Sequence, residues 1–180
     1  MSQSTNPLLT PWTGPFGMPP FEQIAAEHFE EAFEAGFQQH NAEIQAVADS
    51  TAEPDFENTL MALEKSGSLF RRVGLVFHNL TSSHTNDDLK AIERKMAPRL
   101  AAHHAAFFLN EPVFKRIDTL FKQREGLVLA ADEKRLIERY HLDFVRAGAQ
   151  LKGDQRKEFA QNSERLAQCF TRFKIGRAHV

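Results

Sequence analysis

Eight histidines and a large number of glutamates are the residues of this 180-residue chain that could build a metal site. A hydrolytic zinc centre on a helix needs the pattern His-Glu-x-x-His, because this spacing places two imidazoles on one helix face with the glutamate beside them as general base. No histidine of the chain precedes a glutamate, which holds for His28, His40, His78, His84, His103, His104, His141 and His179. The pattern is therefore absent from these 180 residues.

Two other histidine arrangements in the chain could bind a metal ion. A di-iron site in a helical bundle needs Glu-x-x-His twice, with two further inward-facing glutamates, and this chain carries the pattern once, at Glu138 and His141. Standing alone, that pair is expected on an exposed helix face. Adjacent His103 and His104 project about 100° apart on a helix, so we expect them at or near the surface without sharing an ion. We assign no catalytic, cofactor-binding or metal-binding residue within the chain.

The remaining chemical signatures are also missing. No glycine-rich phosphate loop or nucleophile elbow occurs, and the single cysteine, Cys169, falls on the apolar side of a helical pattern, where an inert side chain is expected. The net charge is −2, from 22 basic and 24 acidic residues spread along the chain, so no nucleic-acid partner is expected. No segment approaches the ~18 apolar residues of a membrane span, and the opening residues have no signal-peptide pattern. We expect a cytoplasmic protein without a membrane partner.

Helices must position these residues, because apolar side chains recur at helical spacing almost throughout. Residues 1–20 are rich in proline and glycine and should form an extended arm on the surface of something larger. The helices are predicted from about Phe21 to Val47, from the N-cap Asp55 through Phe77, from Thr85 or Asn86 towards Phe107, from the N-cap Asn110 to Phe121, from about Ala131 to Gln150, and from Asp154 to Phe173.

Several details refine this all-α prediction. Pro98 should kink the third helix, and Gly67 and Gly74 should let another backbone come close. The sixteen phenylalanines fall at helical spacings and are expected in the core rather than on a stacking platform. The brief β-leaning stretch "GLVLA" is too short to build a sheet. The predicted fold class is all-α, a multi-helix array.

Five segments in collinear order resemble one protein family. They read "PPFEQIAAEHFEEAFEAGFQQHNAEIQAVA", "PDFENTLMALEKSGSLFRRV", "SSHTNDDLKAIERKMAPRLAAHH", "LNEPVFKRIDTLF" and "RLIERYHLDFVRAGAQL". They are similar to the N-terminal region of bacterial peptidyl-dipeptidases, also called dipeptidyl carboxypeptidases, in the thimet oligopeptidase family of zinc metallopeptidases. "HTND" and "NTLMALEKSG" are closer to this branch than to the oligopeptidase A branch.

The resemblance implies a two-domain helical clamshell around a deep channel. In such enzymes His-Glu-x-x-His on a downstream helix supplies two zinc ligands and the base, a later glutamate supplies the third ligand, and an activated water attacks the peptide bond. These residues are not in this chain, so none of its residues takes a catalytic role from the family. Residues 21–173 would form an incomplete N-terminal domain, whose partners are oligopeptide substrates and the missing C-terminal part of its own chain.

The last residues, 174–180, do not continue the helical pattern. "IGRAHV" can be encoded by ATCGGAAGAGCACACGTC, which resembles the start of a common sequencing adapter, so we expect a non-native tail on a gene fragment; a natural frayed terminus is the alternative. A fragment should expose apolar stripes and be poorly soluble or self-associate. For function, the resemblance implies the N-terminal part of a zinc peptidase that releases C-terminal dipeptides, and the alternative is a self-contained, non-catalytic helical interaction module.

Overall fold

The computed structural model describes residues 6–155 together with 158, 159, 162, 165, 166 and 169. Every regular element in this part of the chain is helical, which confirms the predicted all-α class. None of its helices combines the length and the apolarity that crossing a membrane requires. The elements are η1 (Pro15–Gly17), η2 (Phe21–Gln23), α1 (His28–Ala48), the π-helical η3 (Phe56–Met61), α2 (Ala62–Lys65), α3 (Ser68–Ser83), α4 (Asp87–Phe108), α5 (Glu111–Gln123) and α6 (Ala131–Arg146).

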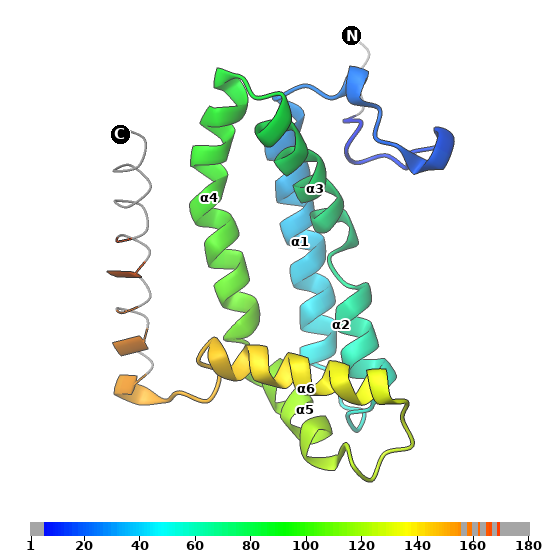
Figure 1. The fold of residues 1–180 in the computed structure, drawn as a ribbon, viewed down its shortest axis with the longest axis vertical. Helices are drawn as coiled ribbons and strands as arrows, with labels where there is room; N and C mark the ends of the chain where they lie inside the picture. The colour runs from blue at the N-terminus through cyan, green and yellow to red at the C-terminus, as the bar shows by residue number, and fades with distance from the viewer. Residues whose placement is uncertain (1–5, 156–157, 160–161, 163–164, 167–168, 170–180) are drawn as a thin grey trace.

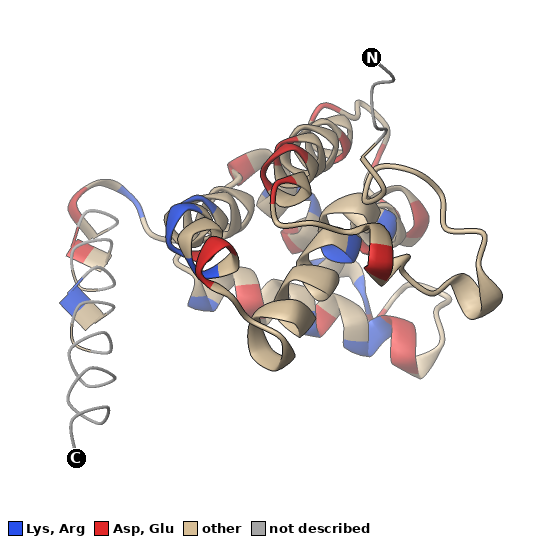
Figure 2. Cartoon of the chain, turned by 90° about the horizontal axis from the view of Figure 1, so that it is seen from above, with Lys and Arg blue, Asp and Glu red and all other residues tan. Residues whose placement is uncertain are grey.

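The longer helices form two groups that share α1. Helices α1, α3 and α4 run along the long axis of the molecule, and α5 and α6 lie together at one end (Figure 1). Helix α1 packs mainly against α3 and also contacts α4 and α5. Figure 2 shows basic and acidic residues interspersed over the helices rather than separated by sign.

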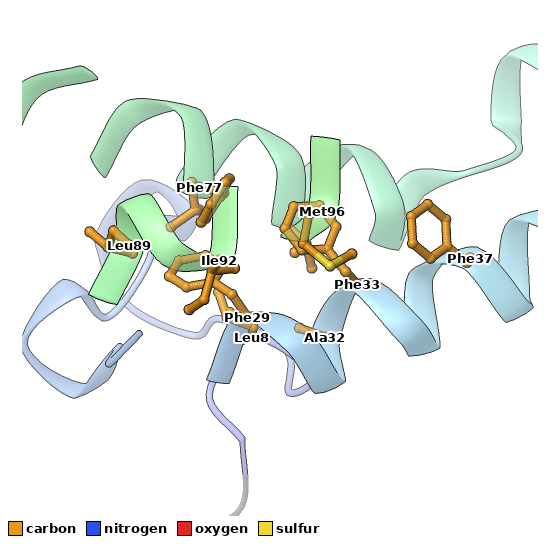
Figure 3. Packing of buried hydrophobic residues seen from close by; sticks show 11 residues of the cluster. Leu8, Phe29, Ala32, Phe33, Phe37, Phe77, Leu89, Ile92 and Met96 are labelled. Carbon is orange, nitrogen blue, oxygen red and sulfur yellow. The ribbon is translucent and has the colours of Figure 1, made fainter. Parts of the chain in front are cut away.

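The first hydrophobic cluster joins α1, α3 and α4 (Figure 3). Phe29 and Phe33 of α1 are buried there against Phe77 of α3, with ring centroids 4.9 Å and 5.3 Å apart in edge-to-face geometry. Met96 of α4 and Leu8 from the N-terminal arm are also fully buried in this cluster. Because burying one such side chain contributes about 1.5–3 kcal/mol, this cluster is a main source of stability for the helix pair α1–α3.

Two further clusters hold the α5–α6 end of the molecule. Ile44 and Val47, near the end of α1, pack with Leu63 of α2 and with buried residues of α5 and α6, namely Val113, Ile117 and Phe144. The third cluster connects η3 to α5 and α6 through Phe56, Leu60, Leu120 and Ile137. The prediction that phenylalanines supply the core is thus confirmed for the six that are buried, Phe29, Phe33, Phe37, Phe56, Phe77 and Phe144.

Three helix starts follow the capping residues predicted from the sequence. The Asp55 carboxylate accepts from the backbone N–H of Asn58 at 2.6 Å, and the Asn58 side chain accepts in return from the N–H of Asp55 at 3.0 Å. The Asn86 side-chain oxygen accepts from the backbone N–H of Leu89 at 2.8 Å. The Asn110 side-chain oxygen accepts in the same way from the N–H of Val113 at 3.1 Å. Each cap satisfies a backbone donor that a helix leaves unpaired in its first turn, and so fixes where the helix begins.

The first and fifth predicted helices have different bounds in the structure. Helix α1 begins at His28 rather than near Phe21, because the backbone at Ile24 is extended (φ −87°, ψ +117°) and ends the short η2 turn. Helix α6 ends at Arg146 rather than Gln150, and the left-handed Gly148 (φ +91°) follows it. Helix α4 continues through Pro98, and the kink expected at this residue stays a prediction.

The predicted helix from Asp55 through Phe77 is wrong as one element, since the chain breaks at Ser66 and Gly67. Gly67 has φ +66°, a left-handed conformation that favours glycine, and its N–H donates to the Glu43 carboxylate at 2.6 Å. A Cβ at Gly67 would lie 3.1 Å from the His40 ring, so the close neighbour is a side chain rather than a backbone. The predicted close approach of another backbone at Gly74 is wrong, because nothing lies within 4 Å of the position that a Cβ would take there.

Helices α1 and α3 approach closely at Gly36 of α1, a position that the sequence pattern did not indicate. A Cβ there would lie 3.0 Å from the Cα of Phe70 on α3, which is tighter than most real Cβ contacts. Glycine at this position therefore allows α1 and α3 to pack backbone against backbone.

The first part of the N-terminal arm packs on the helices of this chain. The Asn6 amide donates to the His28 carbonyl at 2.9 Å and to the Glu31 carboxylate at 3.0 Å. Arg72 of α3 donates to the Leu8 carbonyl at 2.6 Å, and its guanidinium lies 4.8 Å from the centroid of the Trp12 ring. Residues 6–12 are thus fixed to α1 and α3.

At the other end of the chain, Asp154 and Gln155 are helical, as predicted. The continuation of this helix to Phe173 falls largely outside the described residues, and 174–180 fall wholly outside them. Cys169 is exposed rather than covered by an apolar surface. The proposed domain boundaries at 20 and 173 remain predictions.

Candidate functional site

Two of the described histidines meet at the α1–α4 interface. His40 Nδ1 lies 2.9 Å from His103 Nε2, so one imidazole donates a hydrogen bond to the other. Aromatic rings surround the pair: Phe37 and Phe70 lie 4.9 Å from the His103 ring by centroid, and Phe70 stacks against His40 at 5.7 Å. The contact joins residues 63 positions apart in the sequence, so spacing alone could not predict it.

Burial favours the neutral form of both histidines in this pair. Desolvation lowers the pKa of His40, and repulsion from His103 lowers it further, while the Glu43 carboxylate acts in the opposite direction. Desolvation likewise lowers the pKa of His103, with a further contribution from His104. Two positive imidazoles 2.9 Å apart would repel each other, so the hydrogen bond requires that at least one ring stays uncharged.

Surface hollows flank the histidine pair without adding a reactive partner. One, of about 370 Å³, is lined by His103 with Glu34, Phe37, Gln38, Asn41, Arg99, Ala102 and Ala106. Glu34 pairs with Arg99 at 2.5 Å, and Glu43 accepts from Gly67, so these carboxylates already have partners. The arrangement can join helices through a neutral hydrogen bond; it does not bring a nucleophile and a general base together.

The predicted Glu138–His141 pair separates into two unrelated contacts. His141 Nε2 lies 3.3 Å from Asp118 of α5, and its ring stacks on Phe121 at 3.8 Å between centroids. Glu138 instead pairs with Arg135 at 2.9 Å, whose hydrogen bond lowers the pKa of the Glu138 carboxyl. The expectation of an exposed face is wrong for His141, whose side chain is 13% exposed, because α6 packs on α5 and the Phe121 ring covers it.

Two other described histidines have local partners within the fold. His28 Nδ1 accepts from the backbone N–H of Ala25 at 3.0 Å, and His104 packs on Phe108 with ring centroids 4.7 Å apart. Within the residues that the structure describes, no group of three or more His, Cys, Asp or Glu side chains is arranged to hold a metal ion. His179 lies outside these residues.

A surface hollow of about 640 Å³ lies beside a buried arginine. Arg116 of α5 is 6% exposed and donates to the carbonyls of Ser50 and Ala52 at 3.0 Å each, and to the Asn58 side chain at 2.6 Å. Its guanidinium therefore fixes the segment between α1 and η3 against α5. Spacing gave no signal for this residue, because its partners lie 58 to 66 positions earlier.

The fold and the side-chain contacts together define an all-α protein. The polar groups described above hold its helices and connecting segments together.

No known protein-family profile matches the chain. Two curated proteins are similar to it. The dipeptidyl carboxypeptidase of Escherichia coli (strain K12) is 42% identical over 160 residues, which are 88% of this chain and 24% of that protein. The dipeptidyl carboxypeptidase of Salmonella typhimurium (strain LT2) is 43% identical over 148 residues, 82% of this chain and 22% of that protein.

These similarities confirm the resemblance to dipeptidyl carboxypeptidases that the five sequence segments indicated. The chain spans about a quarter of the length of the curated relatives it matches. The relatives are bacterial proteins named as peptidases, so a peptidase parentage is supported for the chain.

Proposed function

We propose that this chain is the N-terminal part of a zinc metallopeptidase that hydrolyses short oligopeptides and releases C-terminal dipeptides. The observation that carries the proposal is 42% identity over 160 residues to a dipeptidyl carboxypeptidase, a similarity that extends over 88% of the chain. The relative is about four times as long as the matched segment, which leaves room for a catalytic domain outside these 180 residues.

The zinc would be held by that further part of the parent protein rather than by this chain. The resemblance implies a His-Glu-x-x-His helix for this task, and no histidine here precedes a glutamate. Glu34, which lines a hollow with His103, and Glu43, which acts on His40, already accept from Arg99 and Gly67. We therefore expect the isolated chain to be inactive with or without added zinc.

The helical array would form one wall of the chamber that admits peptides. Such a wall must keep its shape while a substrate enters, and the contacts described above favour this role. Three hydrophobic clusters and the Arg116 hydrogen bonds connect segments that are distant in sequence. Residues 21–173 would belong to this wall and 174–180 would be a non-native tail; the single cysteine suits the proposed cytoplasmic location.

The experiment starts from the parent gene, read beyond codon 180. The full-length product is expected to contain His-Glu-x-x-His and to release the C-terminal dipeptide from an N-terminally blocked tetrapeptide, as measured by mass spectrometry. A zinc chelator should abolish this release, and added zinc should restore it. The isolated chain, assayed in parallel, should release nothing.

Two results would refute the proposal. A native stop codon near Phe173 would favour the alternative, a self-contained helical interaction module. A full-length product that carries the zinc motif but removes single residues, or cleaves internally, would retain the peptidase class and exclude dipeptide release.

A further inference from the structure

The end of the N-terminal arm presents apolar side chains to solvent. Within residues 14–21, here called the arm tip, Phe16 is 101% exposed, Met18 57% and Phe21 41%. The largest exposed apolar patch of a protein is often a functional contact surface. Figure 1 shows the arm tip lying away from α3, whereas the part of the arm before it packs on α1 and α3.

The arm tip is held in position from both sides. Leu8, before it, is fully buried, and Ile24, after it, packs against the first hydrophobic cluster. Inside the tip the N–H of Gly17 donates to the Gly14 carbonyl at 3.1 Å, and prolines at positions 15, 19 and 20 restrict the backbone. A surface ordered in advance loses little conformational entropy when a partner covers it.

Phe16 also adopts a backbone conformation that needs a reason. Its φ of +57° and ψ of +17° are left-handed, which costs free energy for any residue with a Cβ, and Phe16 is the one non-glycine residue with positive φ in the described part of the chain. Because the Phe16 side chain is fully exposed, no contact of that side chain with the described residues offsets this cost. The conformation turns the aromatic ring outward.

We propose that the arm tip docks, through Phe16 and Met18, onto an apolar surface of the parent protein that lies outside these 180 residues. This inference rests on the proposed function, because it requires the longer parent. The matched relatives are about four times as long as the matched segment, so most of the parent is available to cover the tip.

The size of the tip favours this occupant over a second copy of the chain. Two large side chains and part of a third bury on the order of 400 Å², since one aromatic side chain covers roughly 150–250 Å². A stable contact between separate proteins buries about 600 Å² or more on each partner. A contact within one covalent chain needs less area, because linkage already restricts the relative motion of the two surfaces.

Oxidation of Met18 by hydrogen peroxide, followed by peptide mass spectrometry, tests the proposal. The rate is compared in the 180-residue chain and in the full-length parent, with fully buried Met96 as the internal reference for a folded bundle. In the parent, Met18 should react at least about tenfold more slowly than in the 180-residue chain, because burying one large apolar side chain favours the docked state by about that factor. Phe16→Ser in the parent should restore fast Met18 oxidation, whereas the control Val128→Ser, at a fully exposed loop position, should not.

Equal Met18 rates in the parent and the 180-residue chain, with Met96 slow in both, would overturn the docking. Slow Met18 oxidation in the 180-residue chain, rising as the protein is diluted, would also overturn it in favour of a second copy. A parent that protects Met18 but releases no dipeptide would support the docking and refute only the proposed function.

Discussion

Replacing Arg116 by methionine should destabilise the chain strongly, because this one guanidinium joins three groups from another part of the fold. Its hydrogen bonds to Ser50, Ala52 and Asn58 are 2.6–3.0 Å long, and the side chain is 6% exposed. A hydrogen bond from a charged donor contributes about 1.5–3 kcal/mol, so three give a gross effect of at least ~4 kcal/mol.

Part of this gross effect is offset. The Nε of Arg116 is buried without a hydrogen-bond partner, and removing a buried guanidinium relieves its desolvation cost. Methionine keeps much of the aliphatic length, so little packing is lost. We expect the free energy of unfolding to fall by about 2–3 kcal/mol, as a lower urea midpoint at unchanged slope.

The matched control is Arg139→Met on α6. Arg139 also makes a short contact, 2.8 Å to Asp143 four residues onward, but its side chain is 66% exposed. Such a surface pair contributes at most about 0.5 kcal/mol, so the control should unfold near the wild-type midpoint in far-ultraviolet circular dichroism. The reasoning is refuted if Arg116→Met loses less than about 1 kcal/mol, or no more than Arg139→Met does.

Three further predictions concern helix packing, the histidine pair and a helix cap. Gly36→Ala, whose Cβ would meet Phe70, should be at least about 1 kcal/mol less stable than Gly74→Ala, which gains helix propensity in open space; equal denaturant midpoints would contradict the close approach. Because the folded-state pKa values of His40 and His103 are lowered, the unfolded chain binds protons first, and stability should be full above about pH 6.5 and fall at lower pH. His103→Phe should lose less stability than the wild type between pH 7 and pH 5 in thermal melts, and an unchanged pH dependence would refute the assignment. Asn86→Ala should cost about 1 kcal/mol, whereas Asn86→Asp, which keeps the accepting oxygen, should cost little; similar melting temperatures for both variants would argue against the cap.

Local chemistry made part of this fold predictable from the sequence. The caps at Asp55, Asn86 and Asn110 involve side chains and amides three residues apart, so a short stretch of sequence contains the whole interaction. The apolar spacing likewise identified the helices and the buried phenylalanines. By contrast, the apolar spacing continues across Gly67, and only the conformation of that residue reveals that two helices meet there.

Contacts between distant segments explain the remaining errors. Gly36 reads as an ordinary helix residue until Phe70 is placed opposite it, and the His40–His103 hydrogen bond depends on the packing of α1 against α4. The exposed face predicted for His141 failed for the same reason, since Phe121 of α5 covers the ring. The candidate site therefore could not be predicted from spacing along one helix, because it forms only when two helices pack together.

Helix α1 has a consequence for how the molecule opens. Its 21 residues extend over about 31 Å, and it places fully buried phenylalanines in one core and Ile44 and Val47 in another. When thermal motion loosens α5 and α6, α1 is still held by α3; when α3 loosens, the far end of α1 is still held. We therefore expect α1 to stay folded when either half of the molecule opens locally, so that the opened half can pack back onto it.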